Sequence, residues 1–166
     1  MIASVLGAAG RNARTIGTLT GARTTPEAPD LQRQLAEFVA DGVEAVAMEV
    51  SSHALALHRV DAVHFAVAVF TNLGVDHLDF HGTPEAYFSA KARLFEPGRA
   101  RIGVVNTDDI RGRLLVDAAD GPMVPVGLAD AVDLPMLTPL IGQVAGLDSQ
   151  TTRWWQELGA RDPRLA

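Results

Sequence analysis

The sequence predicts an α/β fold with a mainly parallel sheet flanked by helices. Apolar runs of strand length alternate with helical patterns along the chain, and short loops join them, which is the order expected of parallel strands connected by helices. The chain has 166 residues, of which 48% are hydrophobic and 20% are charged. This composition is too apolar for disorder and can bury a sizeable core, so we expect one main domain.

The first part of the chain predicts a helix followed by two short irregular segments. Residues Met1–Ala9 are apolar and should form a helix that ends at Gly10, although no capping residue precedes it. Thr15–Thr20 predicts a short extended segment. The sequence TTPE from Thr24 predicts a loop.

A second helix should begin at Pro29 and end before Gly42, because proline suits a first helical turn and glycine a helix end. Its apolar residues recur with helical spacing, so they should lie on one face that covers a sheet. These residues are Leu31, Leu35, Phe38 and Val39.

Two apolar runs without clean alternation, Val43–Val50 and His64–Phe70, predict strands that are buried on both faces. Ser51–Arg59 lies between them and predicts a loop or a short helix. Thr71–Gly82 follows the second run and predicts a polar loop rich in Asn, Asp and His.

The next elements continue the alternation of helices and strands. Thr83 and Pro84 begin a helix that should run to about Phe95. After it we expect a strand, a helix and a further strand, over Arg101–Val105, Asp108–Ala118 and Met123–Val126.

Ligands of open parallel sheets bind outside the carboxyl ends of the strands. The loops after Val50, Phe70 and Val105 should therefore carry the function. From about Pro135 the chain becomes rich in proline and glycine. We accordingly divide it into residues 1–134, the α/β part, and residues 135–166, an irregular or helical tail with a detached helix or disorder near Thr151 to Leu158.

Charge and composition exclude several classes of function. The formal net charge is −6 and no cluster of Lys and Arg is present, which argues against a nucleic-acid-binding surface. No apolar run approaches the roughly 20 residues of a membrane span, so we expect a cytoplasmic protein with no membrane partner. The absence of cysteine leaves oxygen and imidazole as metal ligands, which favours Mg²⁺ over Zn²⁺.

The densest group of candidate ligands is the sequence DHLDFH from Asp76 to His81. Such a group can bind a metal ion, but a solvated loop with hydrogen-bonded side chains would look the same, and no standard zinc spacing is present. Glu49 is a second candidate, because it closes an apolar strand. A buried carboxylate needs a metal ion or a cation such as Arg59 as its partner.

Lys91 lies four residues after Tyr87 and four before Phe95, so on a helix it shares an apolar stripe. Its ammonium group can extend along the helix to water. If the amine is instead desolvated, its pKa falls and the neutral form can react with carbon dioxide to give a carbamate. The carbamate would be an oxygen ligand for Mg²⁺.

The other polar candidates have structural alternatives. Thr24 and Thr25 could bind a ligand or form a turn, and Arg59 could hold a phosphate or carboxylate or lie on the surface. The sequence NTDD from Asn106 could contact a nucleotide, or Asp108 could cap the following helix.

Taken in order, five segments resemble the Mur ligase family, and specifically its muramoyl-tripeptide synthetases. They are TLTGARTTPEAPDLQ from Thr18, MEVSSHALALHRV from Met48, FTNLGVDHLDFHG from Phe70, YFSAKARLF from Tyr87 and VVNTDD from Val104. The resemblance extends over about residues 1–133. It implies an ATP-dependent ligase that activates the carboxylate of UDP-MurNAc-dipeptide as an acyl phosphate, which the amine of an amino acid then attacks.

The resemblance also implies roles for individual residues. Glu49 and His77 match ligands of Mg²⁺, Asp76 would orient the histidine, and Lys91 matches a carbamylated lysine. Asn106 would lie near the nucleotide of ATP. The residues that match those holding the precursor are Thr24, Thr25, Ser51 and Arg59.

The chain departs from the family at several points. Arg23 and Leu57 replace the Asn and Gln of some relatives, and the sequence contains no Gly-x-x-Gly-Lys-Thr loop. We therefore interpret it as a fragment of the central domain that lacks the first strand and the phosphate loop, with Met1 an internal methionine. Because that loop supplies backbone donors and a lysine to the phosphates of ATP, we expect the isolated chain to be inactive.

Three other interpretations remain open at the level of sequence. A folylpolyglutamate or cyanophycin synthetase would share the fold, but the TTPE and EVSSH motifs argue against it. A metal-dependent hydrolase built on Asp76 to His81 would work without ATP. A non-catalytic remnant would catalyse neither ligation nor hydrolysis. The sequence does not indicate whether diaminopimelate or lysine is added, nor the oligomeric state.

Overall fold

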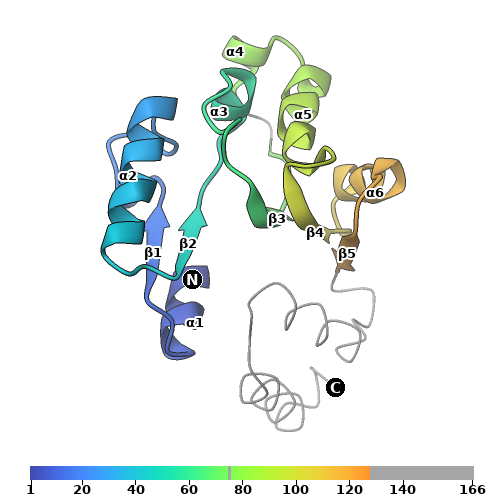
Figure 1. Cartoon of the computed structure of the whole chain (residues 1–166). Helices are drawn as coiled ribbons and strands as arrows, with labels where there is room; N and C mark the ends of the chain where they lie inside the picture. Colours follow the sequence, from blue (N-terminus) through green and yellow to red (C-terminus); the bar gives the residue numbers. More distant parts are fainter. Residues whose placement is uncertain (75, 128–166) are drawn as a thin grey trace, which may run out of the picture. The chain divides into compact units, whose positions relative to one another are not determined.

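The computed structural model describes residues 1–74 and 76–127 (Figure 1). The predicted tail of residues 135–166 lies outside them. The described elements in chain order are α1 (Ile2–Ala8), β1 (Ala13–Ile16), α2 (Ala28–Ala40), β2 (Ala45–Met48), α3 (Ser52–Ala56), β3 (Phe65–Phe70), α4 (Leu78–His81), α5 (Pro84–Ala92), the 3-10 helix η1 (Arg93–Phe95), β4 (Ala100–Asn106), α6 (Ile110–Ala118) and β5 (Met123–Val126).

This order confirms the predicted α/β class, and all strand pairs in the described part are parallel. The chain forms two compact units, one of Met1–Val63 with Asp76–Arg93, and one that contains the described residues of His64–Val75 and Leu94–Ala166. Each unit has its own sheet, so the strands form two sheets where the sequence suggested one.

In the first unit, β1 pairs with β2 from Ala13↔Ala45 to Ile16↔Met48. Helix α1 packs on both strands, and α2 runs alongside them (Figure 1). Leu31 of α2 is fully buried, as its place on the apolar face predicts. Val39 is 76% exposed and does not belong to that face, contrary to prediction.

The two strands of this sheet are shorter than predicted, and the turn after β1 explains the difference. Gly17 ends β1, because its carbonyl accepts hydrogen bonds from the N–H groups of Thr20 at 3.0 Å and Gly21 at 3.2 Å. With its partner ended at Ile16, β2 also ends, at Met48. The residues of β2 are half-buried, not buried as predicted.

In the second unit, β4 lies between β3 and β5. The predicted strand Met123–Val126 is confirmed at both ends. Helix α6 packs against β4 and begins at Ile110, two residues later than predicted. Asp109, not Asp108, caps it by accepting from the N–H of Arg111 at 2.8 Å.

The predicted helix at Thr83 is also confirmed, with the Thr83 hydroxyl accepting from the N–H of Ala86 at 3.1 Å. Helix α5 ends at Ala92, however, and Phe95 lies in η1. The stripe of Tyr87 and Lys91 therefore does not extend to Phe95. Inside the predicted polar loop, α4 adds a single helical turn.

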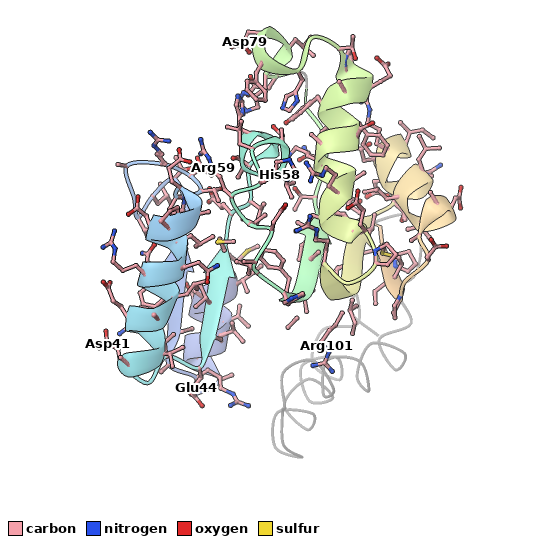
Figure 2. The ribbon with its side chains drawn as sticks, turned by 45° about the horizontal axis from the view of Figure 1, so that its top comes forward. Asp41, Glu44, His58, Arg59, Asp79 and Arg101 are labelled. Carbon is pink, nitrogen blue, oxygen red and sulfur yellow. The ribbon has the colours of Figure 1, made fainter. Side chains whose placement is uncertain are left out.

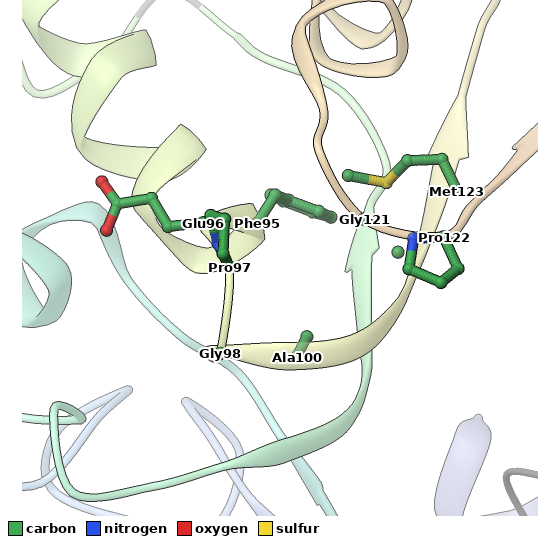
Figure 3. A pocket seen from close by; sticks show the side chains of 9 residues that line it. Phe95, Glu96, Pro97, Gly98, Ala100, Gly121, Pro122 and Met123 are labelled. Atoms are coloured by element: carbon green, nitrogen blue, oxygen red, sulfur yellow. The ribbon is translucent and has the colours of Figure 1, made fainter.

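A pocket of about 190 Å³ lies in the second unit, near the first residues of β4 and β5 (Figure 3). Phe95, Ala100 and Met123 are among the residues that line it. It is at the amino ends of the strands, whereas parallel sheets bind ligands at the carboxyl ends. Its lining is mainly apolar, so we assign it no function.

Across the described ranges, no helix is both long and apolar enough to cross a bilayer.

Gly112 offers a test of the packing between α6 and β4. A Cβ atom at this position would lie 1.9 Å from the carbonyl oxygen of Asn106, so the helix must move to admit any side chain. We predict that Gly112→Ala lowers the free energy of unfolding in urea by about 1–3 kcal/mol, despite the higher helix propensity of alanine. Gly121→Ala, where the added Cβ meets open space, is the matched control and should change it by less than about 0.5 kcal/mol. Equal stabilities of the two variants would contradict the described packing.

Candidate functional site

Glu49 follows β2 directly and lies beside the turn that follows β1. Its backbone N–H donates to the carbonyl of Ile16 at 2.9 Å, which extends the strand pairing by one bond. Its carboxylate Oε2 accepts from the N–H of Thr18 at 3.1 Å and from the Thr18 hydroxyl at 2.8 Å. The side chain is exposed, so the predicted desolvation is wrong, and threonine, not arginine, holds it.

Thr25 contacts the backbone of Glu49 and is only 1% exposed. Its hydroxyl donates to the carbonyl of Glu49 at 2.9 Å and accepts from the N–H of Ser51 at 3.0 Å. The Ser51 hydroxyl caps α3 by accepting from the N–H of Ala54 at 3.1 Å. One buried threonine thus fixes the loop after β2 against the loop before α2.

Arg59 is held against the same loop. Its Nη1 donates to the carbonyl of Thr25 at 3.3 Å, and its Nη2 pairs with the carboxylate of Glu27 at 2.9 Å. The side chain is 14% exposed, and its Nε has no hydrogen-bond partner among the described residues. Glu27 also pairs with Arg23. The predicted Glu49–Arg59 pair is therefore replaced by a pair between Arg59 and Glu27.

Thr24 joins this group through Thr18, because the two hydroxyl oxygens lie 2.9 Å apart. The structure thus brings together five of the predicted residues in one hydrogen-bonded network. They are Thr24, Thr25, Glu49, Ser51 and Arg59. Figure 2 shows Arg59 toward the carboxyl ends of β1 and β2, and Asp41 and Glu44 at the opposite end of this unit.

His77 lies in the same unit, in a second group of aromatic side chains. It adopts a left-handed conformation with φ 56°, and its N–H donates to the Asp76 carboxylate at 2.8 Å. The other oxygen of Asp76 lies 3.6 Å from His77 Nε2. The ring of His77 meets those of His53 and Tyr87 edge-on, with centroids 4.9 and 5.8 Å away.

His81 belongs to the same aromatic group, and its ring centroid lies 5.5 Å from that of His53 and 5.3 Å from that of Tyr87. Its Nε2 lies 2.9 Å from the Ser52 hydroxyl. Burial lowers the pKa of His81, and the neighbouring His53 and His77 lower it further. Over the described ranges, no three or more His, Cys, Asp or Glu residues gather closely enough to hold a metal ion. The rings of His77 and His81 meet at His53 and Tyr87, but they do not form a metal-binding group within this part of the chain.

Lys91 is the one lysine of the sequence and is half-buried on α5. Its Nζ lies 5.4 Å from the centroid of the Tyr87 ring, one helical turn earlier. Burial lowers the pKa of Lys91, since the cation loses solvation. This agrees with the desolvated amine that the sequence allowed. From the sequence, Tyr87 was expected only as a member of an apolar helix stripe. In the structure its ring contacts both Lys91 and His77.

Asn106 belongs to the second unit, at the carboxyl end of β4. Its amide donates to the carbonyl of Thr71 at 2.8 Å, and its oxygen accepts from the N–H of Asp108 at 3.0 Å. Asp109, the last residue of the NTDD segment, has a structural role that the sequence did not predict. Its carboxylate accepts from the N–H of Leu73 at 2.8 Å and so fixes the loop after β3.

Comparison with known proteins shows the family of this chain. A profile of the Mur ligase middle domain matches residues 1–133. The chain belongs to the Mur ligase family. It is 49% identical over 144 residues to a UDP-N-acetylmuramoyl-L-alanyl-D-glutamate--2,6-diaminopimelate ligase of Streptomyces coelicolor, covering 87% of this chain and 28% of that protein. It is 60% identical over 94 residues to the ligase of the same name from Synechococcus elongatus, covering 56% of this chain and 19% of the relative.

A solved Mur ligase structure with the same ligase name resembles the described fold. The TM-score is 0.69 and the identity 31%, over 78% of this chain and 29% of that one. The chain thus spans less than a third of the length of these Mur ligases. The family predicted from five sequence segments is confirmed.

The burial of Lys91 in this Mur ligase domain makes a direct prediction about its protonation. Burial penalises only the charged form, so the amine should lose its proton at a lower pH in the folded chain than in the unfolded chain. Because the sequence has one lysine, ¹³C-methylation of the amine followed by NMR titration reports on this site alone, apart from the chain terminus. We expect a lower midpoint in buffer than in urea. An equal or higher midpoint in the folded chain would show that the amine is solvated.

Proposed function

We propose that this chain provides part of the middle domain of an ATP-dependent ligase that adds diaminopimelate to UDP-MurNAc-L-Ala-D-Glu. The ligase would form an acyl phosphate on the substrate carboxylate, and attack by the amine of the amino acid would release phosphate. The main structural support for this proposal is the hydrogen-bonded network of Thr24, Thr25, Glu49, Ser51 and Arg59. The names of the related ligases support diaminopimelate over lysine.

In this proposal Arg59 and the neighbouring hydroxyl groups hold the precursor. A guanidinium has five N–H donors, and the contacts with Thr25 and Glu27 use two of them. The remaining donors suit a phosphate or carboxylate oxygen. Glu27 neutralises the arginine before the ligand binds and keeps its planar group oriented. Ser51 and Thr24 would add neutral hydrogen bonds.

Glu49, in the same network, suits a magnesium ion. Glu49 is exposed and uses Oε2 for Thr18, while no described residue hydrogen-bonds to Oε1. Mg²⁺ prefers one or two protein oxygen ligands together with phosphate and water. We propose Glu49 and His77 as ligands, with Asp76 orienting His77. A bound Mg²⁺ would offset the negative charge of the phosphates and of the acyl phosphate.

The neutral amine of Lys91 supplies the third proposed ligand group. Its lone pair would attack the carbon of carbon dioxide, form a C–N bond and release one proton, which leaves a carbamate with two oxygens. The lowered pKa of Lys91 favours this reaction because it raises the fraction of neutral amine. Tyr87 and the stem of the lysine shield the group from water.

The remaining assignments are also proposals. Asn106 would lie near the nucleotide of ATP, which its place at the carboxyl end of β4 supports. Residues 1–134 would be the part that belongs to the middle domain, and the ligase would act in the cytoplasm. A hydrolase built on Asp76 to His81 finds less support, since no three His, Cys, Asp or Glu residues in the described part of the chain are grouped so that they could hold a metal ion. The chain itself would not turn over ATP, because its sequence has no phosphate loop.

Binding of the precursor tests the proposal. We predict that the chain binds UDP-MurNAc-L-Ala-D-Glu in isothermal titration calorimetry, and that Arg59→Lys weakens binding about tenfold, since lysine cannot make planar, forked hydrogen bonds. Arg33→Lys is the matched control, because Arg33 is an exposed arginine of α2 whose side chain is 66% accessible. No binding by the unaltered chain, or equal affinities of the two variants, would contradict the proposed precursor site.

A further inference from the structure

Thr18 was not among the predicted site residues, yet it makes the central contact of the network. Its N–H and its hydroxyl both donate to Oε2 of Glu49, at 3.1 and 2.8 Å. The preceding residue, Gly17, lies so close that a Cβ atom there would be 2.8 Å from the Glu49 carboxyl carbon. Residues 17 and 18 therefore hold the carboxylate from the backbone side, and the other oxygen is left for a cation.

The contacts of Thr18 also fix the direction of a second hydrogen bond. A threonine hydroxyl has one proton and two lone pairs. The Thr18 proton is donated to the charged Glu49 carboxylate, which is the stronger acceptor. The bond of 2.9 Å between the hydroxyls of Thr18 and Thr24 must then use the proton of Thr24. With its proton committed, Thr24 can offer only lone pairs to a ligand.

We propose that Thr18 is a positioning residue that couples the cation site to the precursor site, and that it makes Thr24 a hydrogen-bond acceptor for an N–H or O–H group of the precursor. This inference rests on the proposed function for the roles of Glu49 and Thr24. Thr18 itself touches neither ligand. Phosphate and carboxylate oxygens cannot be the partners of Thr24 in this arrangement, because they donate no proton. An amide or sugar hydroxyl group of the precursor suits it.

The coupling follows from the shared hydroxyl. A cation on Oε1 draws charge from the carboxylate and fixes its orientation, which in turn fixes Thr18 and the acceptor direction of Thr24. Cation and precursor should therefore bind with positive cooperativity, and each should raise the affinity of the other by the same factor. Removing the Thr18 hydroxyl should abolish that factor while leaving the Thr18 N–H bond in place.

The first experiment tests the contact itself, without any ligand. Glu49→Gln replaces the charged acceptor of the Thr18 amide, so the amide proton of Thr18 should move upfield in the NMR spectrum of the full chain. Glu44→Gln is the matched control, because Glu44 accepts from the N–H of Asn12 at 2.9 Å. There the Asn12 amide should move and the Thr18 amide should not. An unmoved Thr18 amide in Glu49→Gln would overturn the positioning role.

The second experiment measures the affinity of the chain for UDP-MurNAc-L-Ala-D-Glu with and without Mn²⁺, and for Mn²⁺ alone. Thr18→Val should weaken precursor binding about three- to tenfold, the range expected for one hydrogen bond, and should remove the effect of Mn²⁺. Thr24→Val should do the same, and the double variant should be no weaker than either single one. Thr18→Ser, which keeps the hydroxyl, should restore both properties.

Thr15→Val is the control for replacing a threonine hydroxyl by a methyl group, because Thr15 is exposed on β1 and its hydroxyl has no hydrogen bond to described residues. It should match the unaltered chain. If Thr18→Val also matches it, or if the two valine variants are additive, the coupling role is overturned. Failure of the unaltered chain to bind the precursor would instead contradict the proposed function, and the amide shift of Thr18 would then decide its contact with Glu49.

Discussion

The parallel pairing of β1 with β2 is the constraint on which the rest of the site depends. Because the two strands end in register at Ile16 and Met48, the residues that follow them must meet at one edge. Thr18 then reaches the carboxylate of Glu49, and the buried hydroxyl of Thr25 ties the Glu49 carbonyl to the Ser51 amide. A shift of β2 by one residue would turn its side chains to the other face of the sheet, and Glu49 would no longer lie beside Thr18.

The chemistry of this edge comes from unequal burial of polar groups. Thr25 is buried and fully hydrogen-bonded, so it acts as a rigid support, whereas Glu49 remains exposed and no described residue hydrogen-bonds to its Oε1. Arg59 is mostly buried but is neutralised by Glu27, which avoids the cost of an isolated charge. Lys91 has no acidic partner among the described residues, and burial lowers its pKa.

Sequence reasoning located most of the elements and the site edge, because these depend on local signals. Proline at the start of α2, Thr83 at the cap of α5 and the apolar run of β5 each act within a few residues. The exposure of Glu49 and the pairing of Arg59 with Glu27 were predicted wrongly, since they depend on contacts between distant segments. Thr18 could have been found, because it lies two residues after β1, and the neighbouring strand β2 ends directly before Glu49. The division of the strands into two sheets carries no local signal.

We propose that Lys91 becomes a carbamate beside a cation held by Glu49 and His77. With one lysine in the sequence, ¹³C NMR of the chain in labelled bicarbonate can observe that product directly. We predict a carbamate resonance that is absent from Lys91→Arg. Mn²⁺ should broaden this resonance together with the ring signals of His77. A chain with no carbamate resonance, or with one that Mn²⁺ leaves sharp, would contradict the claim.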